Sequence, residues 1–170
     1  MQYTSKYKNW LGEILLASDG EKLTGLWFLG QKYFADNLEK ENIEKDLPIF
    51  QQTKKWLDIY FSGKLPNFTP PLAFENVSPF RKQVLEILLT IPFGKTSTYG
   101  QIAKQIEKKS GKKVSAQAVG GAVGHNPISL IIPCHRVLGS NSNLTGYAGG
   151  VDKKIELLKL EKIDISKLTT

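Results

Sequence analysis

The sequence contains few of the cysteine and histidine residues that stabilise small proteins through disulfides or metal ions. Among its 170 residues there is one cysteine, Cys134, and there are two histidines, His125 and His135. A single thiol excludes an internal disulfide, and one thiol with two imidazoles cannot build a thiolate-rich structural zinc site. Any metal would have to rest on carboxylates, which nothing in the sequence suggests, so we expect no metal site. We also expect no cofactor.

Long hydrophobic runs and targeting signals are also missing. No apolar run approaches the ~18 residues that span a bilayer, and the start, Met1-Gln2-Tyr3-Thr4-Ser5-Lys6, lacks the regions of a signal peptide. Hydrophobic residues make up 41% and aromatic residues 10% of the chain, which is enough for a buried core. These features predict a soluble cytoplasmic protein without a membrane partner.

The N-terminal part has no excess of positive charge, and the C-terminal part carries all of it. Residues 1–75 contain 9 Lys and Arg against 10 Asp and Glu, while residues 76–170 contain 14 against 6. Such asymmetry favours a polyanionic partner for the second part, most often nucleic acid. A lysine-rich surface without such a partner is the alternative that charge alone leaves open.

The first part reads as strands followed by a helix. The apolar runs 12–18 and 22–29 flank Asp19-Gly20, which favours a hairpin because both residues tolerate positive φ. Residues 36–46 are charged, and we expect a loop or a frayed helix there. Apolar residues recur at helical spacing over residues 50–61, and Gly63 then serves as a C-cap.

A proline-containing stretch separates this part from the rest. Residues 64–75 include Pro66, Pro70 and Pro71 and show no strong periodicity. Proline fixes φ and removes amide donors, so this stretch is predicted to be a linker or extended crossover. We therefore place one α/β domain at residues 1–75 and a second domain at residues 76–170.

The second domain is predicted to be mostly helical. Ser78-Pro79 combines an N-cap with proline at the first helical position, and residues 91–94 end that helix. A short helix near residues 99–106, a basic loop at residues 108–113 and a helix capped by Ser115 follow. Two short helices joined by a turn in a basic region fit a helix-turn-helix, and a helix pair that never contacts DNA is the alternative.

The second of these short helices is rich in small side chains: Ala116, Ala118, Gly120, Gly121, Ala122 and Gly124. Each glycine costs a helix roughly 1 kcal/mol relative to alanine. The pattern therefore indicates close backbone approach, either to a packed helix or to a narrow DNA groove.

A candidate reactive site follows. The short apolar run 129–132 leads to Pro133-Cys134-His135-Arg136-Val137, in which the only thiol precedes a histidine. A free thiol is only about a few per cent ionised at neutral pH, so a nearby base would raise its reactivity. In a strand the two side chains would point to opposite faces, which is compatible with a relay through water. The alternative is a cysteine that is simply buried.

The combined motifs resemble those of the O6-alkylguanine-DNA alkyltransferases, the methylated-DNA–protein-cysteine methyltransferases, and their bacterial members in particular. Residues 133–137 resemble the active-site motif, and residues 91–94, 98–103 and 118–122 the helix-turn-helix. Asn126-Pro127 resembles the family's hinge, residues 146–150 its substrate loop and residues 157–161 its closing helix. The resemblance implies an α+β protein with an N-terminal ribonuclease H-like α/β domain and a mostly helical winged helix-turn-helix domain.

The resemblance also implies roles around the thiol. Cys134 would be the nucleophile and alkyl acceptor, His135 its base through a bound water, and Glu161 the group that holds the imidazole. Asn126 would brace the recognition helix, and Tyr99 would turn the phosphate backbone and offer its hydroxyl to guanine N3. The base pocket would be formed by Val123, Pro133, the carbonyl of Val137, Tyr147 and the backbone N–H of Ala148.

Candidate DNA contacts implied by the resemblance are Thr98, Ser115, Ala116, Gln117, Ala118, Arg136 and Ser140. Gln117 stands where the family often has an arginine that takes the place of the flipped base. Glutamine can still hydrogen-bond an orphaned cytosine, but it lacks the charge and the stacking plane of a guanidinium. Residues for the zinc site of mammalian family members are absent.

The implied function is stoichiometric DNA repair by a monomer. The partner would be double-stranded DNA containing O6-alkylguanine, which must be flipped out because the alkyl carbon is inaccessible within a duplex. The resulting thioether is not hydrolysed, so each molecule acts once. The resemblance implies neither activity on O4-alkylthymine nor cooperative binding to DNA, and both are left as open alternatives. The alternatives are a cysteine hydrolase, a non-catalytic sensor of DNA lesions and a winged-helix regulator that binds a fixed sequence.

Overall fold

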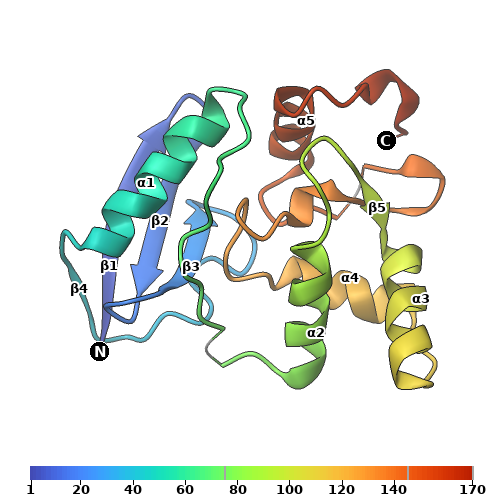
Figure 1. Cartoon of the computed structure of the whole chain (residues 1–170), viewed down its shortest axis with the longest axis horizontal. Coiled ribbons are helices and arrows are strands. Elements are labelled where there is room, and N and C mark those ends of the chain that lie inside the picture. The colour runs from blue at the N-terminus through green and yellow to red at the C-terminus, as the bar shows by residue number, and fades with distance from the viewer. Residues whose placement is uncertain (75, 145, 170) are drawn as a thin grey trace. The chain divides into compact units, whose positions relative to one another are not determined.

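The computed structural model describes residues 1–74, 76–144 and 146–169. It contains two compact units, which are coloured along the chain in Figure 1. The N-terminal domain comprises Met1–Asn76 together with Pro127–Ile131, and the C-terminal domain comprises Val77–Asn126 and Ile132–Thr170. The inclusion of Pro127–Ile131 in the first unit differs from the predicted single stretch of residues 76–170.

The N-terminal domain is built on a four-stranded sheet in the order β3-β2-β1-β4. Strands β1 (Gln2–Asn9), β2 (Gly12–Ser18) and β3 (Leu23–Phe28) are antiparallel neighbours, and β4 (Asn42–Glu44) runs parallel to β1. The predicted hairpin around Asp19-Gly20 is confirmed, since β2 pairs with β3 across it. Strand β1 was not predicted from the sequence.

The charged stretch 36–46 was predicted to be a loop or frayed helix, and for β4 this prediction was wrong. All three residues of β4 are exposed, and Lys45 donates its backbone N–H to the carbonyl of Thr4. An exposed edge strand needs no apolar side chains, and charged residues protect such an edge from pairing with other chains. Hydrophobic periodicity therefore cannot reveal a strand such as β4.

Helix α1 (Pro48–Phe61) covers the sheet, as Figure 1 shows. Its buried residues recur at helical spacing and include Phe50, Trp56, Leu57 and Tyr60. Beneath it, every residue of β3 is buried. Gly25 must be small, because a Cβ there would lie 2.0 Å from the Trp27 ring.

Two segments from outside the hairpin lie along β3. Leu23 donates its N–H to the carbonyl of Pro71, which extends the sheet into the predicted linker. Leu26 donates to the carbonyl of Pro127 and accepts from the N–H of Ser129. These backbone bonds satisfy the free edge of β3 and explain why Pro127–Ile131 belongs to this domain.

The C-terminal domain begins with α2 (Pro79–Leu88), capped as predicted by Ser78, whose Oγ accepts from the Arg81 N–H. After the turn at residues 91–94 come β5 (Ser97–Thr98), α3 (Tyr99–Ser110) and α4 (Ala116–Gly124). Helix α3 is a turn longer than predicted, because Thr98 and Gln101 form a capping box and Gly111 at φ +70° ends it. Ser115 caps α4 as predicted.

The remaining elements of this domain follow the hinge. A 3₁₀ turn, Cys134–Arg136, leads into β6 (Val137–Leu138), which pairs in parallel with β5. Helix α5 (Val151–Leu160) closes the domain and is followed by the 3₁₀ turn Ile165–Lys167. Figure 1 shows α5 in red and the α3–α4 pair in yellow and orange. No helix among the described residues is long and apolar enough to cross a membrane.

Candidate active site

Cys134 opens a tight 3₁₀ turn rather than lying in a strand. The N–H of Cys134 donates to the carbonyl of Ile132 at 2.8 Å, and the N–H of Arg136 donates to Pro133 at 3.0 Å. The thiol residue is only 5% exposed, and the next two residues are also buried. The strand geometry assumed from the sequence was wrong, because Pro133 and these short-range bonds favour a turn.

His135 and Glu161 form a fully enclosed pair. The imidazole Nε2 lies 2.5 Å from Oε2 of Glu161, and both side chains are 0% exposed. Burial lowers the pKa of His135 below its usual 6.5, against the raising effect of Glu161. The neutral imidazole therefore donates from Nε2, and Nδ1 is its basic atom. The structure thus brings together His135 and Glu161, the two residues for which the resemblance implied a base and its partner.

The Glu161 carboxylate is held as an anion by several donors. Its Oε1 accepts from the Arg136 Nε and from the Gly94 N–H, each at 2.9 Å. Burial acts to raise the pKa of Glu161, but His135, Arg136 and the Gly94 N–H outweigh it and lower the pKa to about 2. Glu161 is thus ionised at any physiological pH.

Arg136 lies inside this cluster, whereas the resemblance implied that it contacts a DNA phosphate. The residue is 8% exposed, and its Nη1 donates to the Ile91 carbonyl at 2.7 Å. Its guanidinium carbon lies 5.8 Å from the centre of the Phe93 ring. The buried side chain thus directs Nε and Nη1 at groups of its own domain rather than at a DNA phosphate.

Lys154 on α5 is a charged residue of the site that the sequence analysis missed. It is 0% exposed, and its Nζ donates to the carbonyl of Val137 at 2.6 Å. Burial lowers the pKa of Lys154 from 10.5 to about 8, and the nearby Cys134 partly opposes this. The sequence could have revealed this, because Lys154 shares one helical face with Leu157, Leu158 and Glu161. A lysine on a mostly apolar face is unusual and indicates a buried charge.

Two tyrosines face the thiol. Burial raises the pKa of Tyr99 from 10.0 to about 12 and raises that of Tyr147 well above its usual 10.0, and Cys134 adds to both shifts. Both hydroxyls therefore stay protonated at neutral pH and are available as hydrogen-bond donors. The Tyr147 hydroxyl is buried and, among the described residues, has no hydrogen-bond partner.

Gly146, in the segment that precedes α5, fits closely against Tyr99. The Tyr99 hydroxyl lies 3.5 Å from the Gly146 carbonyl. Gly146 has φ +91°, and a Cβ there would lie 2.9 Å from the same hydroxyl. Only glycine fits this position without displacing Tyr99.

Asn126 connects the end of α4 to the active-site turn. Its Nδ2 donates to the carbonyl of Ile132 at 2.8 Å, and its own N–H donates to Val123 at 3.1 Å. Asn126 is 4% exposed. A single buried side chain thus links the end of α4 to the segment that precedes Cys134.

A groove of about 490 Å³ lies beside the two helices of the helix-turn-helix. It is lined by Thr98, Tyr99, Gly100, Ala116, Gln117, Gly120, Ser140 and Gly146. Five of the residues expected to contact DNA or base therefore meet at one place: Thr98, Tyr99, Ala116, Gln117 and Ser140. Val119, on the opposite side of α4, is fully buried.

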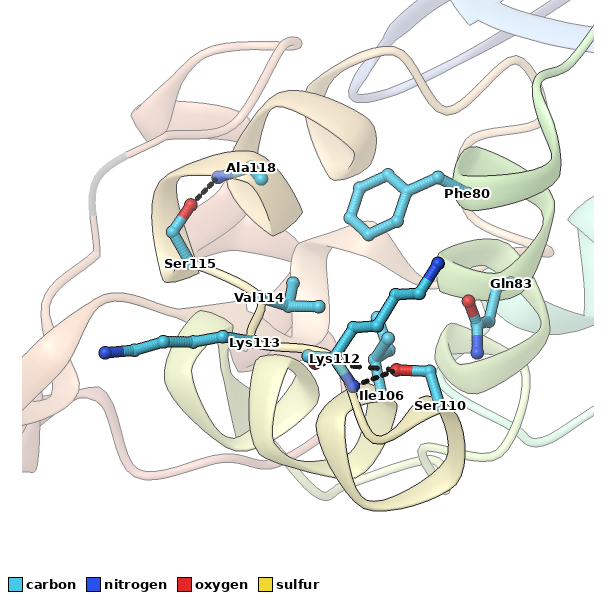
Figure 2. Close-up of a pocket in the computed structure, with 9 residues that line it drawn as sticks. All are labelled: Phe80, Gln83, Ile106, Ser110, Lys112, Lys113, Val114, Ser115 and Ala118. Carbon is cyan, nitrogen blue, oxygen red and sulfur yellow. Dashed lines mark hydrogen bonds between the residues drawn. The ribbon is translucent and has the colours of Figure 1, made fainter.

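A second hollow, of about 700 Å³, lies on the other side of the α4 N-terminus and is shown in Figure 2. Its lining includes Phe80, Ile106 and Val114, and Lys112 extends across it. Ser115 and Ala118 line this hollow rather than the groove, which separates them from the other expected DNA contacts. No thiol or imidazole lines it, so it is not the reactive site.

The remaining expected pocket residues are in the same domain. Val123, Pro133 and Val137 are buried, and Ala148 is half-buried. The Val137 carbonyl already accepts from Lys154, which leaves its second lone pair for another donor. Among the described residues, no group of three or more His, Cys, Asp or Glu side chains lies together as a metal site would require.

The fold is similar to that of solved structures. Mycobacterium tuberculosis OGT in complex with DNA is 38% identical, with a TM-score of 0.82 over 99% of this chain and 96% of that one. An O6-methylguanine methyltransferase structure from the same organism is 40% identical, with a TM-score of 0.80 over 95% of this chain and 93% of that one.

Sequence relatives and family models agree with this likeness. The methylated-DNA–protein-cysteine methyltransferase of Haemophilus influenzae is 41% identical over 95% of this chain and 87% of its own length. The one from Methanosarcina acetivorans is 42% identical over 94% and 97%. Models of the ribonuclease-like and DNA-binding domains of 6-O-methylguanine DNA methyltransferase match residues 2–74 and 79–163. The chain belongs to the 6-O-methylguanine DNA methyltransferase family.

Proposed function

We propose that this chain repairs DNA by transferring the alkyl group of O6-alkylguanine in duplex DNA to Cys134, once per molecule. The observation that carries the proposal is the buried Cys134, which directly precedes a neutral His135 held by the Glu161 carboxylate and lies near a buried lysine, in the domain that holds the helix-turn-helix. These groups together favour a thiolate in a place that water reaches poorly.

The thiolate is formed and stabilised by its neighbours. The Cys134 proton passes to Nδ1 of His135 through a bound water, and Glu161 stabilises the imidazolium that results. The Lys154 cation interacts favourably with the thiolate, as its electrostatic coupling to Cys134 indicates. A thiolate is the reactive form of cysteine, so these groups determine the rate of attack.

The transfer step follows from this charge arrangement. Sulfur attacks the alkyl carbon in line, the new S–C bond forms as the C–O6 bond breaks, and the electron pair of that bond goes to the guanine. Tyr99 donates to guanine N3 and the Ala148 N–H to O6, which stabilises the charge that develops on the base. The raised pKa of Tyr99, about 12, keeps its hydroxyl a donor throughout.

DNA is bound by the groove, with Gln117 occupying the stack that the flipped nucleotide leaves. Gln117 lines this groove beside Thr98, Ala116 and Ser140, and it is exposed. Small side chains on α4 allow the helix to approach the DNA backbone closely. The base pocket comprises Tyr147, Val123, Pro133 and the Val137 carbonyl. A monomeric, cytoplasmic protein is part of the same proposal.

The alternatives are less well supported. A lesion sensor or winged-helix regulator does not need a thiol beside an oriented histidine, whereas this chain has both. A cysteine hydrolase would turn over a thioester many times, which the proposed thioether product does not permit.

The test is a titration of the protein with excess duplex containing O6-methylguanine. Repair should stop when one guanine has been restored per protein molecule, and Cys134→Ser should restore none while still binding the duplex. Repair that continues beyond one event per molecule, or repair by Cys134→Ser, would contradict the proposal.

A further inference from the structure

We propose that Arg136 is a positioning residue for alkyl transfer, which fixes the Glu161 carboxylate so that it presents one oxygen to His135. This inference rests on the proposed function, since it concerns the rate of that reaction. It replaces the phosphate contact that the family resemblance implied for Arg136.

The guanidinium of Arg136 joins three segments of the C-terminal domain. Its Nε donates to Oε1 of Glu161 at the end of α5, and its Nη1 donates to the carbonyl of Ile91 in the turn after α2. Arg136 itself belongs to the same 3₁₀ turn as Cys134. The planar group also lies over Phe93, with 5.8 Å between its carbon and the ring centre. Two fixed N–H directions therefore define where Glu161 lies relative to the active-site turn.

Glu161 depends on such support because of where it is placed. It is the C-cap residue of α5, where the helix dipole is negative and disfavours a carboxylate. Its side chain is 0% exposed, so water does not compensate the charge. With Arg136 and the Gly94 N–H on Oε1, the other oxygen is left to accept from His135. Without Arg136, Oε1 would lose the donor that comes from the active-site turn, and the carboxylate could rotate.

The composition of the chain indicates that the shape of arginine matters here. Only two of its 23 Lys and Arg residues are arginine, Arg81 and Arg136. The chain thus uses lysine for nearly all of its positive charge and places one arginine in this buried pair. A lysine ammonium is a point charge that cannot direct two N–H groups at Glu161 and Ile91 in one plane.

The experiment compares Arg136→Met and Arg136→Lys with the natural chain, and uses Arg81→Met as the matched control. The first readout is the rate of transfer from free O6-benzylguanine, which needs no DNA. We expect a loss of roughly 10- to 100-fold in both variants, because misplacing a catalytic group by about 1 Å has such effects. Arg81→Met should retain the natural rate.

The second readout is the pH profile of that rate, which a merely structural role would not change. The charged and titratable groups that act on His135 are Glu161, Arg136 and Lys154, and Arg136 lowers the pKa of His135. Removing the cation in Arg136→Met therefore raises that pKa, and the acid limb of the profile shifts to higher pH. In Arg136→Lys the rate should fall with a smaller shift, since a charge is retained.

The third readout is the salt dependence of binding to undamaged duplex. It should be unchanged in Arg136→Met, which also shows that the variant is folded. A phosphate contact would instead reduce the slope by about one unit and leave transfer from the free base intact, and this result would overturn the inference. Natural rates and profiles in both Arg136 variants would also overturn it. If the natural chain itself fails to react with O6-benzylguanine, the proposed function fails instead.

Discussion

Replacing Lys154 by methionine should make the free protein no less stable while slowing alkyl transfer. Lys154 is completely buried, and burial lowers its pKa from 10.5 to about 8. At 1.36 kcal/mol per pKa unit, keeping this lysine charged in the folded protein costs roughly 3 kcal/mol at neutral pH. Methionine has a similar length and no charge to bury. It leaves the Val137 carbonyl without its donor, which costs about 1–3 kcal/mol.

The net expectation is a variant that is more stable by about 0–2 kcal/mol near pH 7, the difference between these two effects. The pH dependence is the sharper test. As pH falls, the unfolded chain binds a proton at Lys154 before the folded chain does, so the cost is absent well above pH 10.5 and complete below about pH 8. The stability advantage of Lys154→Met should therefore shrink by roughly 2 kcal/mol between about pH 7.5 and pH 10.

The assay is denaturant unfolding of both proteins at several pH values, together with the rate of transfer from free O6-benzylguanine. The rate should fall on the order of tenfold, because the thiolate of Cys134 loses a neighbouring cation. Lys159→Met is the matched control on the same helix, since Lys159 is half exposed and its loss should change stability by less than about 0.5 kcal/mol. A constant stability difference across this pH range, or an unchanged rate, would refute the reasoning.

Two further predictions concern the groove. Gly146→Ala should lower the transfer rate far more than Gly150→Ala, because both residues have positive φ but only a Cβ at Gly146 meets the Tyr99 hydroxyl. Single-turnover kinetics of both variants measure this difference. Equal losses of rate would count against a role for the close fit between Gly146 and Tyr99. Gln117→Gly should slow repair in duplex DNA much more than transfer from the free base, which needs no flipping; equal losses on the two substrates would mean that Gln117 supports the pocket instead.

Local sequence signals predicted much of the fold. The Asp19-Gly20 hairpin and the caps at Ser78 and Ser115 appear in the structure as expected, since each depends on a few neighbouring residues. Strand β4 escaped prediction because its residues are exposed and carry no apolar pattern. The pairing of Pro127–Ile131 with β3 escaped because it depends on backbone bonds between segments about 100 residues apart.

The site was predictable where a motif names the residues and unpredictable where the fold alone brings groups together. The approach of His135 to Glu161 followed from the resemblance, and the structure brings the two together. Lys154 belongs to no motif, and only its position on the buried face of α5 reveals it. The resemblance implied a phosphate contact for Arg136, whereas its hydrogen-bond partners Glu161 and Ile91 come from distant segments, which a local motif does not reveal.

The most direct test of the account is the intact mass of the protein after incubation with duplex DNA containing O6-methylguanine, followed by peptide mapping. We expect the mass of one added methyl group per molecule, located on Cys134, the only cysteine of the chain. Cys134→Ser should gain no mass under the same conditions. An unmodified protein that has nevertheless restored the guanine, or a methyl group on any other residue, would contradict it.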